Sequence, residues 1–490
     1  MFPQNKRQTD ASLARSTIAP SIASLIDSDS DTNRRGFLCG AGLTAISITA
    51  VATAVLPGSA LAAMPSEPPA PDAFPAQGFK SHLDNRSRVS RGRLDEIASA
   101  VHKAFNNPEI LSPFDSAVHG ATYDVELYRI TAFTQVPETG ETLKVSGLLA
   151  VPLDVKGPLP VVSWQHGTIL SFNQVPSNLT SIADPAYVMR DNVDSMETLL
   201  NVQRLAGNGY AVIAADYIGK GPFRNGRAEA YATKGATVQT CIDILDAGLR
   251  GLKELGYQTS QLFLNGWSQG ALNTQWLHQE LRRQGRPIAA TAVESPFNDL
   301  NESFRFWAGA ESYPSPSAKA YPRLADWISL CMIVTLGSYQ RQYGLDGLLQ
   351  SAIRPEFHAL ALKFWDDYQM DFDPKRPFPS GSTLLVDGFF ERYTNDLNSR
   401  FLRQLAANRA TYWAYDAPIR FYYGLSDEAI HPALVNRPLS AGGRHAIGVP
   451  IAGASHRGTV LASLYFESKV VGDSTNVLRW FNAVKANGRP

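Results

Sequence analysis

The most informative segment of this chain is Gln261-Leu262-Phe263-Leu264-Asn265-Gly266-Trp267-Ser268-Gln269-Gly270-Ala271. A Gly-x-Ser-x-Gly turn that joins a strand to a helix raises its serine hydroxyl above a sheet, and its glycines leave room for a strained backbone. Here residues 261–265 predict the strand and residues 271–283 predict the helix. The context therefore predicts that Ser268 is an activated nucleophile rather than a serine of an ordinary turn.

Strands and helices alternate on both sides of this turn. Two runs of alternating polarity, residues 123–134 and 143–152, predict a hairpin around residues 137–140. Elsewhere apolar runs predict strands at 159–164, 210–215, 288–293, 419–423 and 449–451, and three- and four-residue spacing predicts helices from about 94, at 195–205, at 236–255 and at 460–484. This order favours an α/β fold whose mostly parallel central sheet is flanked by helices.

The alternation stops between residues 293 and 419. We therefore expect residues 299–415 to form a large insertion late in the sheet. The sheet domain would then consist of two parts, residues 79–298 and 416–490.

A serine hydroxyl is a weak nucleophile, so it needs a histidine that takes its proton and a carboxylate that orients this histidine. In a sheet of this kind the acid follows a later strand, and the histidine follows the acid along the chain. Asp427 comes after the predicted strand 419–423, and His456 stands between the strand 449–451 and the last helix. We therefore expect a triad of Ser268, His456 and Asp427.

Other acids and histidines remain alternatives. Glu428 and Glu294 are the alternative acids, the latter because it also follows a predicted strand. His445 is the alternative base, whereas His431, which a proline follows, is interpreted as a loop residue. His166 precedes the nucleophile in the chain, so we expect it to order a loop.

Hydrolysis at a serine also needs backbone amides that stabilise a negative oxygen. One is expected from Gln269, directly after the nucleophile. The other is expected from the loop after the strand 159–164, where Gly167 and Thr168 lie, with Thr168 preferred.

Taken together, these motifs resemble the α/β-hydrolase superfamily, and within it the secretory lipase and related esterase branch. The resemblance covers residues 120–485 and rests on the serine turn, Gln-His-Gly-Thr at 165–168, Asp-Tyr-Ile-Gly-Lys-Gly at 216–221, Gly-Leu-Ser-Asp at 424–427 and Gly-Ala-Ser-His at 453–456. It implies an α/β-hydrolase fold with a helical cap between the sixth and seventh core strands. It also implies hydrolysis of carboxylic esters without a metal or organic cofactor. The residues before 120 depart from the pattern of this branch.

The expected cap is rich in aromatic side chains, with 21 of them between Asn298 and Asp416. They include Phe304, Phe306, Trp307, Tyr313, Trp327, Phe364, Trp365, Phe389 and Phe390. Such side chains can fill the cap's own core or line a cleft beneath it. Some are expected to line the cleft, which favours an apolar or aromatic ester as the partner.

The charge balance argues against nucleic acid as a partner, because Lys plus Arg and Asp plus Glu each number 45. No metal is expected either. An acidic cluster, Asp366, Asp367, Asp371 and Asp373, could hold Ca²⁺ but is interpreted as a solvated loop. Cys241 and Cys331 are interpreted as two buried thiols, with a disulfide as the alternative in an exported protein.

The N-terminal sequence is typical of an export signal. Arg34 and Arg35, within Thr-Asn-Arg-Arg-Gly-Phe-Leu, fit a twin-arginine signal. The apolar residues 37–56 follow, and then a small-x-small site that ends at Ala62. We expect residues 1–62 to be removed and 63–78 to form a linker. The mature protein would be periplasmic or secreted and without a stable membrane anchor, an uncleaved span of 37–56 being the alternative.

Two other functions fit the same residues. A serine peptidase or amidase on this fold would use the same triad, because an amide leaving group also takes a proton from His456. A non-catalytic binding protein of this fold would be expected to lack a member of the triad. The residues quoted above leave the oligomeric state open.

Overall fold

The computed structural model describes residues 82–190, 194–224, 226, 228–369, 378–468 and 474–487, all within the compact unit of residues 76–490. The expected signal peptide and linker lie outside these residues, as do Asp371 and Asp373. Within the described ranges, no helix combines the length and the apolar character that crossing a membrane requires.

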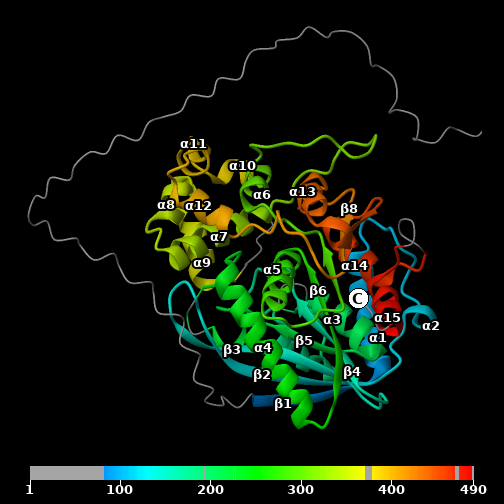
Figure 1. Ribbon diagram of the computed structural model, residues 1–490. Helices are drawn as coiled ribbons and strands as arrows, with labels where there is room; N and C mark the ends of the chain where they lie inside the picture. The colour runs from blue at the N-terminus through cyan, green and yellow to red at the C-terminus, as the bar shows by residue number, and fades with distance from the viewer. Residues whose placement is uncertain are drawn as a thin grey trace, which may run out of the picture. The chain divides into compact units, whose positions relative to one another are not determined.

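A nine-stranded sheet forms the centre of the structure, with the strand order β1-β2-β3-β5-β4-β6-β7-β8-β9 (Figure 1). The strands are β1 (His82–Val89), β2 (Val125–Gln135), β3 (Thr142–Pro152), β4 (Leu159–Gln165), β5 (Ala211–Ala215), β6 (Thr259–Trp267), β7 (Ala290–Glu294), β8 (Ile419–Gly424) and β9 (Ala446–Ile451). Strands β1, β2, β3 and β5 pair antiparallel, and all the pairs from β5 to β9 are parallel. The prediction of a mostly parallel sheet is confirmed.

Helices connect these strands. They are α1 (Arg91–Phe105), α2 (Ser116–His119), α3 (Met196–Leu205), α4 (Lys234–Glu254), α5 (Gln269–Arg283), α6 (Leu300–Trp307), α7 (Ile328–Tyr343), α8 (Leu348–Ala352), α9 (His358–Asp367), α10 (Gly381–Leu384), α11 (Phe389–Tyr393), α12 (Arg400–Ala407), α13 (Ala433–Ala441), α14 (His456–Tyr465) and α15 (Val477–Asn487). Short 3₁₀ helices are η1 (Pro176–Ala183), η2 (Ala206–Asn208), η3 (Gly221–Phe223), η4 (Pro355–Phe357) and η5 (Gly443–His445).

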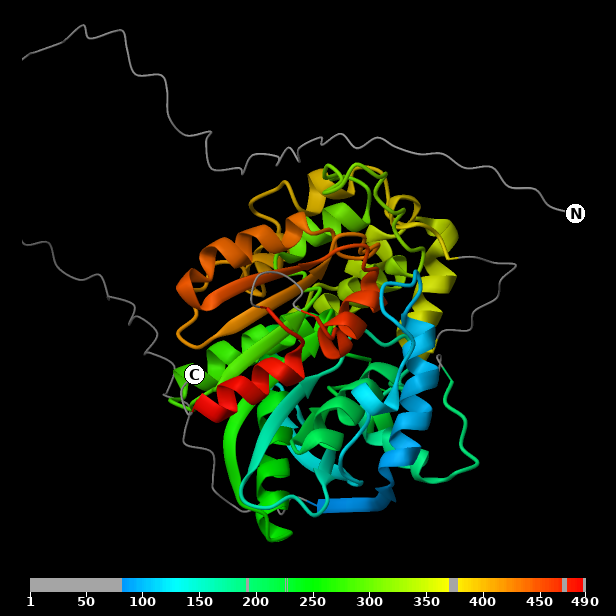
Figure 2. The ribbon, with the colours of Figure 1, turned by 90° about the vertical axis from the view of Figure 1, so that its right-hand side faces the viewer.

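The sheet is covered on both faces because successive strand residues point to opposite sides. Leu264 of β6 joins the hydrophobic cluster that contains Trp276 of α5, together with side chains of α4. Its neighbour Phe263 joins the opposite cluster, where its ring lies 4.6 Å from the ring of Phe481 on α15. Figure 2 shows α1, in blue, and α15, in red, on the side of the sheet that faces the viewer. Each fully buried side chain of this kind contributes about 1.5–3 kcal/mol.

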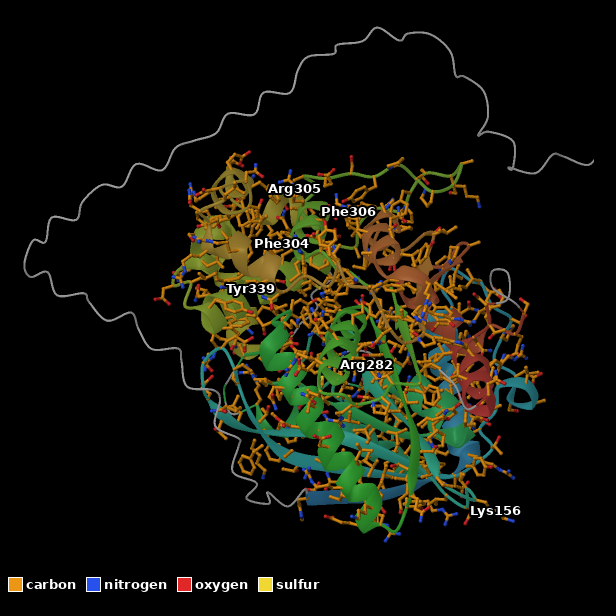
Figure 3. All side chains as sticks on the ribbon, in the orientation of Figure 1. Lys156, Arg282, Phe304, Arg305, Phe306 and Tyr339 are labelled. Carbon is orange, nitrogen blue, oxygen red and sulfur yellow. The ribbon has the colours of Figure 1, made fainter. Side chains whose placement is uncertain are left out.

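The inserted segment, residues 299–415, holds helices α6 to α12 between β7 and β8. Most of the aromatic residues named from the sequence fill its interior, among them Phe304, Phe306, Trp307, Phe364, Trp365 and Phe389. Figure 3 places Phe304 and Tyr339 inside this group of helices, and both side chains are buried. The core of the inserted segment therefore accounts for most of the aromatic residues that the sequence singled out.

Strand β1 is not predicted by the sequence pattern, because it is a sheet edge with few apolar residues. It pairs antiparallel with β2 on one side only. Charged side chains hold it, with Asp84 2.6 Å from Arg129 and Arg86 2.7 Å from Glu126. Because such ion pairs hold β1 in place, its sequence does not alternate between apolar and polar residues.

The prediction of one closing helix over 460–484 is wrong, since the structure has two helices, α14 and α15. Phe466 ends α14 with extended backbone angles, φ −61° and ψ 123°. The side chain of Asn476 donates to the Phe466 carbonyl at 2.7 Å and accepts the Arg479 N–H at 2.9 Å. Asparagine is a favoured N-cap. This cap outweighs the apolar periodicity that suggested a continuous helix.

Helix α5 approaches β4 closely at Gly270. A Cβ atom at Gly270 would lie 1.9 Å from the carbonyl oxygen of Gln165, and one at Gly266 would lie 2.4 Å from the carbonyl oxygen of Gly270. Backbone oxygens of a strand or a helix cannot easily move aside, so the two glycines are required by this approach and not only by the turn.

We predict that Gly270→Ala lowers the free energy of unfolding by about 3 kcal/mol or more, because overpacking against backbone cannot relax. The measurement is urea unfolding. Gly92→Ala is the matched control, because nothing lies within 4 Å of a Cβ there and the site is helical. The control is expected to stabilise the protein by up to about 1 kcal/mol. Equal stability of the two variants would contradict the argument.

Candidate active site

Ser268 lies at the turn from β6 into α5 with a strained backbone, φ 57° and ψ −118°. A non-glycine residue in such a region costs on the order of 1–3 kcal/mol. Its N–H donates to the carbonyl of Glu294 at 2.8 Å, and its own carbonyl accepts the N–H of Ala271 at 2.9 Å. The turn is therefore held from the neighbouring strand and from the following helix. The side chain is buried except for its face toward a pocket.

His456 begins helix α14, and its ring faces Ser268. Its Nε2 lies 3.0 Å from Ser268 Oγ. Its backbone N–H donates to the Glu428 carboxylate at 2.9 Å, and its carbonyl accepts the Trp267 indole N–H at 3.2 Å. The indole of Trp327 lies beside the same ring, tilted by 41° with centroids 6.0 Å apart. These contacts fix the position of the imidazole.

Asp427 follows β8 and is fully buried. Its two carboxylate oxygens lie 3.0 and 2.9 Å from Nδ1 of His456. They also accept the backbone N–H groups of Ala429 and Ile430 at 2.9 and 2.8 Å and the hydroxyl of Ser295 at 2.6 Å. A carboxylate can only accept, so Nδ1 of His456 carries the proton and Nε2 is left to accept one from Ser268.

The charge of Asp427 decides the protonation of His456. Burial by itself lowers the pKa of His456, because it penalises the imidazolium. The negative charge and hydrogen bond of Asp427, with a smaller contribution from Glu428, outweigh burial and raise the pKa above 6.5. The ring can therefore take a proton from Ser268 and hold it as an ion pair with Asp427.

The alternative acids lie elsewhere. Glu294 accepts hydrogen bonds from Asn265 at 2.8 Å and Ser463 at 3.3 Å. Burial raises the pKa of Glu294 to about 8, so it is largely neutral at pH 7. Glu428 contacts the backbone of His456 and not its ring. Of the three acids, the structure brings Asp427 to the imidazole.

The other histidines have other partners. His445 lies in η5, where its Nε2 accepts from Arg444 at 3.1 Å. His431 accepts the N–H of Ala433 at 3.1 Å and packs 4.3 Å from the ring of Tyr321. The remaining candidate, His166, is the buried histidine of the loop after β4.

His166 holds the loop that carries Gly167 and Thr168. Burial lowers the pKa of His166 to about 4, so the ring is neutral at pH 7. Its Nδ1–H donates to the Gly167 carbonyl at 2.8 Å, and its ring stacks 4.2 Å from that of Tyr217. These contacts give the loop a defined shape beside Ser268.

The residues expected to provide amides lie on the two sides of Ser268. Gln269 is the first residue of α5. Thr168 lines the same pocket as Ser268, and its hydroxyl is 2.8 Å from that of Tyr231. Gly167 packs against Trp267, whose ring carbon would lie 2.8 Å from a Cβ atom at that position.

The pocket above Ser268 has a volume of about 480 Å³. Leu170, Trp267, Trp327 and Phe378 form its apolar walls. Its other lining residues are Thr168, Ser268, Asp326, Glu428, His456 and Arg457. Trp327 and Phe378 come from the inserted segment, so this segment forms part of the pocket.

No group of three or more His, Cys, Asp or Glu residues suited to a metal occurs in the described ranges. Of the acidic cluster, Asp367 pairs with Lys363 at 2.8 Å, and the Asp366 carbonyl accepts from Arg224. Cys241 and Cys331 are buried free thiols.

Three contacts at this site have no counterpart in the sequence analysis. Ser295 binds the carboxylate of Asp427, Tyr321 donates to the Asp427 carbonyl, and Trp327 covers His456. Ser295 directly follows a predicted strand, which is a weak signal. Nothing in the local pattern marks Tyr321, and Trp327 is marked only as one of the aromatic residues of the expected cap.

Comparisons with known proteins agree with this fold. No protein-family model and no curated protein sequence matches the chain. Similar solved structures include a Legionella pneumophila protein described as a hydrolase (TM-score 0.63, 20% identity, 82% of this chain and 98% of that one). They also include the rice cell wall degrading esterase LipA of Xanthomonas oryzae (0.60, 19%, 78% and 94%) and Candida antarctica lipase A in its closed state (0.50, 12%, 76% and 77%). The chain thus has the α/β-hydrolase fold, as its motifs predict.

We predict that Asp427→Asn lowers the pKa of His456 below its ordinary value, because burial is then opposed only by the smaller charge effect of Glu428. The measurement is a pH titration of the His456 ring by ¹⁵N NMR. Glu294→Gln is the control, since it replaces a largely neutral buried acid by a neutral side chain of the same shape. An unchanged His456 pKa in Asp427→Asn would refute the pairing.

Proposed function

We propose that this α/β-hydrolase-fold chain is a serine hydrolase that cleaves carboxylic esters. The observation that carries the proposal is the hydrogen-bonded series from Ser268 through His456 to Asp427, with its serine end open to a pocket. The series contains a nucleophile, a base and an orienting acid in contact, which is what acyl transfer at a serine needs.

The reaction begins when His456 Nε2 takes the proton of Ser268 Oγ as this oxygen attacks the ester carbonyl. Asp427 stabilises the imidazolium that forms and keeps its tautomer. The tetrahedral intermediate collapses when His456 gives the proton to the leaving alcohol, which leaves an acyl-enzyme on Ser268. Water then attacks this ester, again with His456 as base, and releases the acid.

The intermediate carries a negative oxygen that must be stabilised. We assign the backbone N–H of Gln269 and that of Thr168 to this oxygen, with Gly167 shaping the loop that presents Thr168. Each such donor is worth about 3–4 kcal/mol in the transition state. The donors belong to rigid elements, the start of α5 and the loop fixed by His166, so they need little reorganisation.

The pocket supports an ester with an apolar or aromatic group. Leu170, Trp267, Trp327 and Phe378 offer stacking and apolar contact. Two of the structural neighbours are described as an esterase and a lipase, which supports ester cleavage by this fold. A pocket of about 480 Å³ favours a compact acyl group over several long chains.

A second candidate is an amide or peptide substrate with a free amine. Two carboxylates, Asp326 and Glu428, line the pocket and could receive a cationic group. Arg457 lines the same pocket and offsets part of this charge. Esters therefore rank first, and amides are the alternative that the assays below separate.

We predict that Ser268→Ala abolishes labelling by a fluorophosphonate probe and reduces turnover of p-nitrophenyl esters by at least about 10⁴-fold, because the nucleophile is gone. The measurements are gel fluorescence and release of p-nitrophenol across acyl chains of varied length. Aminoacyl anilides are assayed in parallel.

The control is Ser440→Ala, which removes an exposed hydroxyl on α13 and is expected to retain labelling and turnover. Full labelling of Ser268→Ala would refute the nucleophile. Turnover of anilides without turnover of esters would replace the ester proposal with the amide one.

We further propose export by the twin-arginine route, with a periplasmic or secreted mature protein. The sequence around Arg34 and Arg35 supports it. We predict that Arg34→Lys with Arg35→Lys leaves the precursor in the cytoplasm of a bacterial host, as read by fractionation and immunoblot. Arg15→Lys, outside the pair, is the control and is expected to be exported. Normal export of the double variant would contradict the route.

A further inference from the structure

A buried ion pair lies behind the proposed oxyanion donors. Nζ of Lys220 is 2.7 Å from a carboxylate oxygen of Glu229, and the two side chains are 0% and 1% exposed. Both residues precede helix α4, and Lys220 belongs to the turn 216–221. A buried pair is costly to desolvate and is weak support for a purely stabilising role. Its contacts indicate a positioning role instead.

Glu229 connects this pair to Gln269. One carboxylate oxygen accepts the side-chain amide of Gln269 at 2.7 Å. The other faces Lys220 and accepts the hydroxyl of Tyr368. The Lys220 ammonium also lies 3.3 Å from the centre of the Tyr368 ring, a cation–π contact. These three partners fix the orientation of the Glu229 carboxylate. Its hydrogen bond in turn holds the side chain of Gln269 in place.

Tyr231 connects the same stretch of chain to Thr168. The two hydroxyls lie 2.8 Å apart. The N–H of Tyr231 donates to Ser338 Oγ on α7 at 2.8 Å, and this hydroxyl donates to the Glu229 carbonyl at 2.8 Å. Ser338, a residue of the inserted segment, thus hydrogen-bonds to the backbone of both Glu229 and Tyr231. Residues 229–231 therefore reach the two proposed oxyanion donors from one short segment.

Tyr368, at the end of α9, connects Glu229 to the loop that carries Thr168. Its carbonyl accepts the N–H of Phe172 at 2.9 Å, and Ser171 forms an antiparallel bridge with Gln369. The hydroxyl of Tyr368 binds Glu229. The inserted segment therefore contacts the supports of both donors.

We propose that residues 229–231 form a positioning strut for the oxyanion hole, in which Glu229 orients Gln269, Tyr231 orients Thr168, and Lys220 with Tyr368 fixes Glu229. This proposal rests on the proposed function. Glu229 and Tyr231 are buried and lie outside the pocket lining, so they act through Gln269 and Thr168 and not on the substrate.

The first test uses Tyr231→Phe, which removes only the hydroxyl that faces Thr168. The second uses Lys220→Met with Glu229→Gln, which removes both charges and leaves no buried charge unpaired. Each is expected to lower kcat for a p-nitrophenyl ester by on the order of 10- to 100-fold with KM within about twofold, because a displaced donor acts in the transition state. Affinity for an aryl trifluoromethyl ketone, whose adduct with Ser268 carries the oxyanion, is expected to fall in proportion.

Asp216→Asn is the matched control. Asp216 is a buried carboxyl of the same turn, and it binds Ser146 at 2.5 Å and the Ser177 N–H at 2.9 Å, away from Gln269. It is expected to lower the melting temperature while kcat and ketone affinity stay within about twofold. A merely structural role for Glu229 and Tyr231 would give their variants the same result as this control.

The proposal is overturned if both variants keep wild-type kcat and ketone affinity, or if they change only in melting temperature. Failure of the proposed function has a different signature. In that case the wild-type protein would bind no ketone, and Ser268→Ala would hydrolyse the ester as fast as the wild type does. The positioning role would then be refuted together with the proposed function.

Discussion

The backbone of Ser268 is the constraint on which the rest of the site depends. Its positive φ stores on the order of 1–3 kcal/mol, and this conformation persists only if the surroundings leave no alternative. Gly266 and Gly270 permit the close contact of α5 with β4 and β6, and the Glu294 carbonyl holds the Ser268 N–H. The sheet core therefore determines where the serine oxygen lies, and the histidine and acid are placed relative to it.

Two buried acids at the ends of the neighbouring strands β7 and β8 have different hydrogen-bond partners. Glu294 and Asp427 are both fully buried, yet their partners differ. Asp427 accepts two backbone N–H groups and a hydroxyl and faces His456, so its negative charge is stabilised by donors on several sides. Glu294 has two neutral partners, and burial raises its pKa to about 8. The same fold thus provides a charged acid for the imidazole and a neutral one beneath the serine turn.

Sequence patterns predicted the parts of this structure that depend on local signals. The strand–turn–helix around Ser268 and the positions of Asp427 and His456 after strands follow from periodicity and chain order. Strand β1 lacks such a signal because an edge needs few apolar residues, and Asn476 divides the last helix by a side-chain cap that periodicity ignores. The contacts of Ser295 and Glu229 could not be predicted, because no motif or rule of chain order connects these side chains with their partners, which lie 132 and 40 residues away in the chain.

The inserted segment contributes more than a cover for the pocket. Trp327 lies beside the ring of His456, and Tyr321 donates to the Asp427 carbonyl. Ser338 and Tyr368 contact the residues behind Gln269 and Thr168. His456, Asp427 and the residues that support the two proposed donors thus each have a neighbour in this segment. Because buried contacts of this kind have few alternative arrangements, a change in the packing of α7 or α9 reaches the reacting groups as well as the substrate walls. Substitutions in this segment that change the substrate walls are therefore constrained, because they must also preserve the positions of the reacting groups.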